Sequence, residues 1–405
     1  MSERHGDLRL LSEALRGRDP YHRLARLREQ SPYSPSDGLV VVGRYEHCAR
    51  ILRHSQVSSG WERARINRRA EPVSRNFLTL DPPDHTRLRR LVTKAFTPRM
   101  VTRLEPLIQT ETDELLEAAA GRGRFDVAAD LASPMPMSVI CGLLGVPVAD
   151  HARLRAWAAP LAQQLDLPQL RPGGQRAAPG VARARADIIR YFRDLIEFRR
   201  DTPADDLISR LIAVQEDGDQ LTESELISTC ILLISAGHDT SANLIGNGVL
   251  ALLEHPDQRE QLAARPGYAA AYVEEVLRHD PPVQLVTRVV TADFDLDGFA
   301  LAEGDLVLML LGAANRDPDI FPQPEVFDPH RDHAARHLSF AAGPHFCLGA
   351  GLARLEAAIV LETLAKRLVD PRLEAHGVTY KPTFSLRGPE RLPVFVQGLR
   401  ERKTR

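Results

Sequence analysis

The chain has 405 residues, of which 43% are hydrophobic and 26% charged, as in an ordinary globular protein. Its net charge of -2 gives no overall field that attracts nucleic acid or a membrane surface, so neither is expected as a partner. The four cysteines are widely separated and the first residues carry charges without an apolar run, which favours a cytoplasmic location over a disulfide-stabilised or membrane-inserted protein.

Apolar side chains recur with helical spacing through most of the chain. The clearest helices are expected over residues 100–120, 181–200, 222–255, 268–279 and 349–369. Strand-like segments are fewer and occupy 38–43, 285–310 and 392–399. Because strands and helices do not alternate regularly, we predict a mainly α fold with one domain over 1–405. Its small β-rich portion is expected mainly at 38–60, 285–310 and 375–400.

The expected helix over 222–255 is the longest in the chain. Thr222 and Glu225 have the spacing of a capping box at its start. Its interior is apolar on almost every face, which places it in the core. Gly237, within the polar stretch 235–241, predicts a local kink there.

Cys347 has three alternative roles: a buried structural thiol, a nucleophile or a metal ligand. Base rates favour the structural thiol. His345 lies two residues away, and alternating residues of an extended loop point apart, which disfavours a nucleophile with His345 as its base. The position favours a ligand, because Gly349 and Gly351 open the helix whose N–H groups stabilise a thiolate. A zinc site with His330, His333 or His337 is a weaker alternative, since the paired spacing of zinc ligands is absent.

Four motifs resemble those of the cytochrome P450 family, in the family's order. Phe340, Gly343, His345, Cys347 and Gly349 match its haem-binding signature, with Ala341 where the family usually has Gly. "YVEEVLR" (272–278) resembles its ExxR motif, and "AGHDT" (236–240) resembles its oxygen-activation motif. "DPPDHTRLRRLVTKAF" (81–96) resembles the helix that binds the haem propionates.

The resemblance implies a cytochrome P450 fold, with haem b buried between the long central helix and the loop that holds Cys347, the axial ligand of the iron. It implies further haem contacts from Ala236, Phe340, Gly343 and Gly349, and propionate contacts from His85, Arg89, Arg288 and His345. It also implies a structural network of Glu275, Arg278 and Arg331 that supports the cysteine loop.

The implied activity is that of an O2-dependent monooxygenase that hydroxylates or epoxidises its substrate. Asp239 and Thr240 would relay the protons that dioxygen reduction consumes. No flavin or iron–sulfur motif is present, so electrons are expected from a ferredoxin and its NAD(P)H-dependent reductase. Separately, the protein is expected to be a monomer. Arg87, Arg90, Lys94 and Arg99 form either a docking patch for an acidic partner or a solvated face. A haem protein that binds ligands without turnover is the alternative function.

The substrate is expected to be large and hydrophobic, by family analogy a polyketide or macrolide-type secondary metabolite. The arginine-rich stretch 61–77 either faces a polar or carrier-tethered part of the substrate or is a solvated loop. The residues expected to line the pocket are Trp61, Phe77, Leu232, Leu233, Val283, Leu285, Val286, Phe384 and Leu386.

Overall fold

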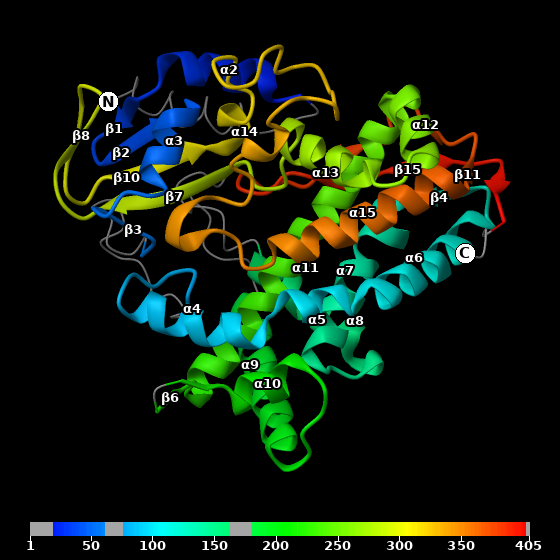
Figure 1. Ribbon diagram of the computed structural model, residues 1–405, viewed down its shortest axis with the longest axis horizontal. Coiled ribbons are helices and arrows are strands. Elements are labelled where there is room, and N and C mark those ends of the chain that lie inside the picture. The colour runs from blue at the N-terminus through cyan, green and yellow to red at the C-terminus, as the bar shows by residue number, and fades with distance from the viewer. Residues whose placement is uncertain (1–18, 61–75, 163–179, 217, 402–405) are drawn as a thin grey trace.

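The computed structural model describes residues 19–60, 76–162, 180–216 and 218–401. A large helical body occupies the right and lower parts of Figure 1, and a smaller β portion lies at the upper left. The mainly α architecture is therefore as predicted. No helix in these described ranges is both long and apolar enough to cross a membrane.

The main sheet has five strands in the order β1-β2-β10-β7-β3. Strands β2 and β10 are parallel, and the other neighbours are antiparallel. Side chains of β2 and β10 alternate between two buried clusters, so the sheet is covered on both faces. The strands are β1 (Tyr33–Ser36), β2 (Leu39–Val42), β3 (Val57–Ser58), β7 (Leu285–Val290) and β10 (Leu306–Leu310).

Shorter strands lie outside this sheet, several of them beside the helical body (Figure 1), and most belong to the C-terminal part of the chain. A three-stranded sheet has the order β12-β15-β4, and the other strands pair in twos. These are β4 (Arg124–Asp126), β5 (Gln215–Glu216), β6 (Asp219–Gln220), β8 (Phe294–Leu296), β9 (Phe299–Leu301), β11 (Leu368–Val369), β12 (Arg372–Leu373), β13 (Thr379–Tyr380), β14 (Pro389–Arg391), β15 (Pro393–Phe395) and β16 (Gly398–Leu399).

Helices occupy the five predicted ranges and further segments between them, and two predicted segments differ from expectation. Segment 100–120 is divided by a turn at Arg103 and Leu104, and the second helix begins at Glu105 with Pro106 in its first turn, where proline is favoured. Segment 38–60 contains helix α3 between its strands. The helices are α2 (Tyr21–Gln30), α3 (Tyr45–Ile51), α4 (Asp84–Ala95), α5 (Pro98–Thr102), α6 (Glu105–Ala120), α7 (Pro134–Leu144), α8 (His151–Ala162), α9 (Val181–Asp201), α10 (Leu207–Ala213), α11 (Glu223–Glu254), α12 (Pro256–Ala264), α13 (Tyr268–His279), α14 (Leu311–Ala314) and α15 (Ala350–Arg367).

Helix α11 passes through the centre of the helical body, in contact with α15 (Figure 1). The predicted capping box is present: Glu225 N–H donates to Thr222 Oγ1 (3.3 Å), and Thr222 N–H donates to Glu225 Oε2 (2.8 Å). The helix is unbroken through Gly237, where the sequence predicted a kink. Gly248 allows the close approach of α15, since a Cβ there would lie 2.7 Å from Leu361 Cδ1.

Glu356 is a buried acid at the interface of α11 and α15. Burial raises its pKa to about 8, although a hydrogen bond with Ser241 acts in the opposite direction. Its Oε2 atom has no hydrogen-bond partner. The carboxyl group is therefore largely protonated at neutral pH in the folded protein.

This burial predicts a pH dependence of stability. Between about pH 4.5 and 8 the folded protein keeps a proton on Glu356 that the unfolded chain releases, so the free energy of unfolding should fall as pH rises. The slope is at most ~1.4 kcal/mol per pH unit. Glu356→Gln should remove this contribution in urea unfolding measured across that window. Glu362→Gln, on the same helix and ion-paired to Lys366, should keep it. An unchanged slope in Glu356→Gln would contradict the buried-acid interpretation.

Candidate active site

Cys347 lies in a tight loop just before α15. Its N–H donates to the Phe340 carbonyl (2.9 Å), and α15 begins three residues later at Ala350. Of the four cysteines, Cys347 is exposed, whereas Cys48, Cys141 and Cys230 are buried. The loop therefore presents this thiol instead of packing it in the core, which argues against a structural role.

The surroundings of Cys347 act on its thiol in two directions. The side chain reaches solvent on one side but has many protein atoms around it, and the resulting desolvation raises its pKa. The N–H groups of Gly349 and Ala350 and the positive charges of Arg89 and Arg354 oppose this effect. The sequence correctly placed thiolate-stabilising groups at the start of the helix, but desolvation outweighs them.

Ala341 has a left-handed backbone conformation, with φ of 56°. Its N–H donates to the Leu338 carbonyl at 2.8 Å. An L-residue with a Cβ in this region costs about 1–2 kcal/mol relative to an ordinary conformation. The family's usual Gly at this position avoids that cost, and so does Gly343 at φ 68°, where a Cβ would also lie 2.6 Å from the Leu52 carbonyl oxygen.

Hydrogen-bond donors gather beside the loop from three separate segments. The rings of His85 (α4) and His345 lie 4.2 Å apart. Both ring nitrogens of His85 are buried without a hydrogen-bond partner. Arg288 (β7) donates to its neighbour's carbonyl at Thr287 (2.7 Å), and no ion pair involves it within the described ranges. Arg89, one turn after His85, donates to the Phe346 carbonyl.

The pKa values of His345 and Arg288 are both lowered, because each group is desolvated beside other positive or protonatable groups. Desolvation, followed by repulsion from Arg288 and His85, lowers the pKa of His345 to about 3. Desolvation lowers the pKa of Arg288 to about 10, against the attraction of Asp81. Such a buried cluster is costly unless an anion binds to it.

These residues fit a haem better than a zinc ion. The unmatched donors suit two carboxylates, and a Cβ at Gly349 or Gly351 would meet no protein atom within 4 Å, so protein packing does not explain these glycines. In the part of the chain that the structure describes, no three His, Cys, Asp or Glu side chains form a metal site. His330 contacts Gln261 and His337 contacts Glu274, which leaves the zinc alternative without a ligand set.

The polar residues of α11 lie at the middle of the helix. Thr240 Oγ1 donates to the Ala236 carbonyl (2.5 Å). Asp239 Oδ1 is 3.0 Å from Lys381 Nζ and 3.7 Å from His238 Nδ1. His238 is buried against Ser133, and desolvation lowers its pKa, so its ring is largely neutral at pH 7.

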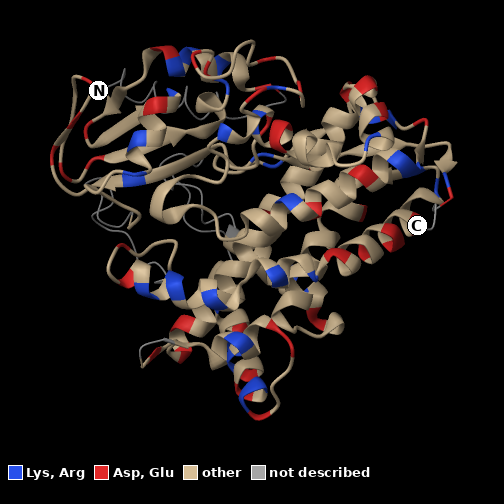
Figure 2. Ribbon diagram, in the orientation of Figure 1, with Lys and Arg blue, Asp and Glu red and all other residues tan. Residues whose placement is uncertain are grey.

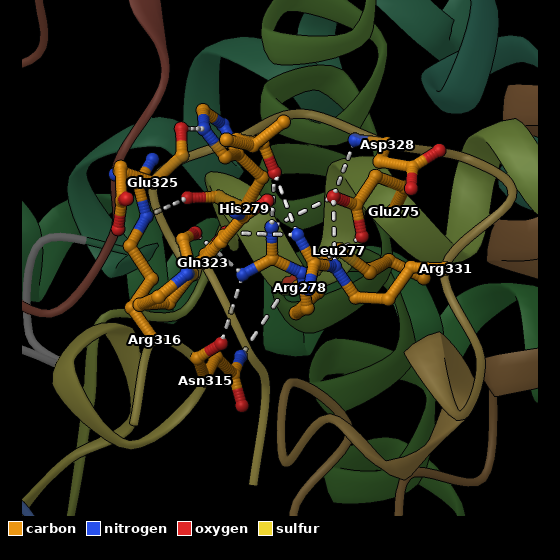
Figure 3. Close-up of polar contacts among 12 residues, drawn as sticks. Glu275, Leu277, Arg278, His279, Asn315, Arg316, Gln323, Glu325, Asp328 and Arg331 are labelled. Carbon is orange, nitrogen blue, oxygen red and sulfur yellow. Dashed lines mark hydrogen bonds and ion pairs between the residues drawn. The ribbon is translucent and has the colours of Figure 1, made fainter. Parts of the chain in front are cut away.

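A buried ion-pair network supports the loop from the α13 side (Figure 3). Glu275 and Arg278 are both 0% exposed and share two hydrogen bonds of 2.7 Å. Arg331 Nε lies 3.6 Å from Glu275 Oε1, so the structure brings the three predicted network residues together. Arg278 also donates to the backbone carbonyls of Asn315, Pro324 and Val326.

Asn315 connects this network to the cysteine loop, a role that the sequence did not indicate. Its Oδ1 accepts from Leu338 N–H (2.7 Å) and its Nδ2 contacts Ser339 Oγ (2.8 Å). Ser339 Oγ donates in turn to the Leu277 carbonyl of α13 (2.6 Å). The start of the loop is therefore hydrogen-bonded to the helix that carries Glu275 and Arg278.

The residues expected to line a substrate pocket divide into three groups. Leu232, Leu233, Val283 and Val286 are half-buried, and Val283 forms a β-bridge with the buried Leu386. Leu285 and Phe384 are a correction: they are 3% and 1% exposed in the core cluster on the other face of the sheet, because alternate residues of β7 point to opposite faces. Phe77 is buried in the main core, and Trp61 lies outside the described residues, as do 62–75 of the arginine-rich stretch.

The predicted basic patch is smaller than expected. Lys and Arg recur along α4 (Figure 2), but Arg87 is ion-paired with Asp219 and Glu225. Arg90, Lys94 and Arg99 are exposed. A surface for a charged partner would therefore rest on these three residues.

Comparison with known proteins gives one consistent result. A family model described as "Cytochrome P450" matches residues 33–369. A biotin biosynthesis cytochrome P450 of Bacillus subtilis is 39% identical over 88% of this chain and 90% of its own length. The polyketide biosynthesis cytochrome P450 PksS of the same organism is 34% identical over 93% and 95%. The ligand-free crystal structure of CYP164A2 from Mycobacterium smegmatis superposes with a TM-score of 0.89 at 44% identity, covering 97% of this chain and all of that one.

The strain at Ala341 gives a direct test. Ala341→Gly should increase the free energy of unfolding by about 1 kcal/mol, because glycine adopts positive φ without a Cβ clash. The matched control is Ala342→Gly, at an extended φ of -153°, which should lower stability. Thermal unfolding of the purified variants measures both. Equal destabilisation by the two substitutions would show that Ala341 is not strained.

Proposed function

The chain belongs to the cytochrome P450 family and is an oxidoreductase of the monooxygenase type, and from this premise we propose the specific reaction. It inserts one oxygen atom from O2 into a hydrophobic small molecule, by hydroxylation or epoxidation. The observation that carries the proposal is the exposed Cys347 thiol in a loop whose His345 ring lies 4.2 Å from that of the buried His85, which has no hydrogen-bond partner on either ring nitrogen. The predicted fold class and family are confirmed by the comparisons.

We propose haem b as the cofactor, with Cys347 as the iron ligand. His85, Arg89, Arg288 and His345 would bind the propionates, and Arg89 also donates to the Phe346 carbonyl of the loop. Phe340, Gly343, Gly349 and Ala236 would contact the ring, with Gly349 permitting close backbone approach. When bound, the haem supplies the redox centre at which O2 is activated.

Asp239 and Thr240 are the proposed proton-transfer residues. Asp239 is partly exposed, so its carboxylate can take protons from solvent. The Thr240 hydroxyl, held by the Ala236 carbonyl, keeps oxygen lone pairs available to accept a hydrogen bond. An acid and an alcohol on adjacent residues provide a route for protons toward the reacting centre.

The proposed substrate is a polyketide or macrolide-type secondary metabolite. The half-buried apolar side chains of Leu232, Leu233, Val283 and Val286 suit such a molecule. The similarity to PksS, which is described as a polyketide biosynthesis enzyme, supports the same class. The arginine-rich stretch 61–77 would face a polar or carrier-tethered part of such a substrate. Residues 61–75 of this stretch lie outside the described ranges.

The proposed physiological setting is a single-domain monomer in the cytoplasm that receives electrons from a ferredoxin and an NAD(P)H-dependent reductase. Four free cysteines suit a reducing compartment. The exposed Arg90, Lys94 and Arg99 suit an acidic electron-transfer partner.

The ligand assignment is tested by Cys347→His. This variant should lose the carbon monoxide absorption band that is characteristic of haem–thiolate proteins, because the sulfur ligand is gone. Cys48→Ala, which changes a thiol buried beside the sheet, should keep the band. Persistence of the band in Cys347→His would refute Cys347 as the ligand.

The proton-transfer assignment is tested by Thr240→Ala, with a substrate chosen from a polyketide panel by its shift of the haem spin state. Product formed per NAD(P)H should fall about 10-fold or more, with the electrons recovered as hydrogen peroxide, while the haem spectrum stays unchanged. Thr240→Ser keeps the hydroxyl and should restore product formation. Full coupling in Thr240→Ala would disprove the relay.

A further inference from the structure

Lys381 contacts the carboxylate of Asp239 from a part of the chain 142 residues away. We propose that Lys381 is a positioning residue for proton transfer: it holds Asp239 at the solvent-facing end of the route to Thr240. This inference rests on the proposed function, in which Asp239 and Thr240 carry protons. Neither the sequence motifs nor the comparisons assign a role to Lys381.

The backbone of the β13–β14 hairpin fixes Lys381 beside α11. Lys381 N–H donates to the Gly388 carbonyl (3.2 Å). Gly388 packs directly on Asn243, since a Cβ at Gly388 would lie 2.4 Å from Asn243 Cγ. Asn243 is one helical turn after Asp239 and therefore lies on the same side of α11.

A second contact fixes the orientation of the hairpin. Pro389 packs against Gly246, where an added Cβ would lie 2.9 Å from Pro389 Cδ. Two glycines, one on each element, thus allow the hairpin and the helix to approach closely. The position of Lys381 follows from this packing, so its contact with Asp239 is built into the fold.

Lys381 is the charged partner of Asp239 in the described structure. The other group in contact, His238, is largely neutral because desolvation lowers its pKa, and the nearby Arg155 acts in the same direction. The ammonium Nζ lies 3.0 Å from Asp239 Oδ1. Lys381 therefore holds the carboxylate in one orientation through this contact.

The pair is arranged so that it can exchange protons with water. The Asp239 and Lys381 side chains are 18% and 26% exposed, and partly exposed ion pairs of this kind contribute only ~0–1 kcal/mol. Asp239 can therefore take up a proton from solvent, and the neutral carboxyl group then separates from Lys381. After Asp239 passes the proton toward Thr240, the carboxylate re-forms and pairs with Lys381 again, so no proton is consumed at the pair.

Substitution of Lys381 tests this role in the reconstituted holoenzyme. Lys381→Met should lower product formed per NAD(P)H by about 5-fold, less than the loss of about 10-fold or more expected for Thr240→Ala, whose hydroxyl transfers the proton itself. It should also increase the solvent deuterium isotope effect on turnover. Haem content, the carbon monoxide spectrum and substrate affinity should not change.

Three further variants make the result specific. Lys381→Arg keeps the charge and should restore most of the coupling. Lys366→Met changes another of the four lysines, in an exposed ion pair on α15, and should behave like the wild type. The double variant Asp239→Asn with Lys381→Met should be no worse than Asp239→Asn alone, because Lys381 acts through Asp239.

Each outcome decides the proposal. Wild-type coupling and isotope effect in Lys381→Met would overturn it while leaving the relay intact, provided that Thr240→Ala is uncoupled. Equal loss in Lys381→Met and Lys381→Arg, together with loss of haem, would show a purely structural role and also overturn it. Full coupling in Thr240→Ala would instead reject the proton relay itself.

Discussion

The buried ion pair between Glu275 and Arg278 is the interaction on which the cysteine loop depends. Two charges with no solvent exposure are costly unless every donor and acceptor is matched. Arg278 is matched by Glu275 and by backbone carbonyls of the segment after α14, so the charge itself forces that segment to pack on α13. Through Asn315 the same packing reaches Ser339, at the start of the loop. The hydrogen bonds that the buried Arg278 charge requires thus fix the segment from which the Cys347 loop begins.

This anchoring explains why the loop tolerates strain. Ala341 has a positive φ, and Gly343 approaches the Leu52 carbonyl more closely than any Cβ would allow. Backbone conformations of this kind persist where the surrounding structure holds both ends of the segment. Here Ser339 is bound to α13, and Cys347 N–H closes the loop on the Phe340 carbonyl. The loop is therefore shaped by its ends, and Ala341 accepts the cost that a glycine would avoid.

The sequence predicted features that depend on local spacing. The capping box of Thr222 and Glu225, the contact between Glu275 and Arg278 and the helices over 181–200, 222–255 and 268–279 follow from residues three or four apart. It did not predict contacts that only the tertiary structure creates, such as those of Asn315, Glu356 and Lys381. The helix assignment is continuous through Gly237, where the sequence predicted a kink, and Thr240 satisfies its hydroxyl on the helix backbone. Leu285 was misplaced because a continuous apolar strand gives no sign of which face each side chain takes.

The two sides of the site differ in how firmly their charges are held, and this difference suits their proposed tasks. On the cysteine side, Glu275 and Arg278 are excluded from water, and separating them would leave an unpaired buried charge, so the ligand loop has one arrangement. On the α11 side, Asp239 and Lys381 are reached by water and joined by a weak pair. A metal ligand must keep its place through every turnover, whereas a proton carrier must change its charge and its partner in each one. The packed hairpin, with a flexible lysine side chain directly after β13, meets the second requirement, because the backbone stays in place while only the side-chain contact opens.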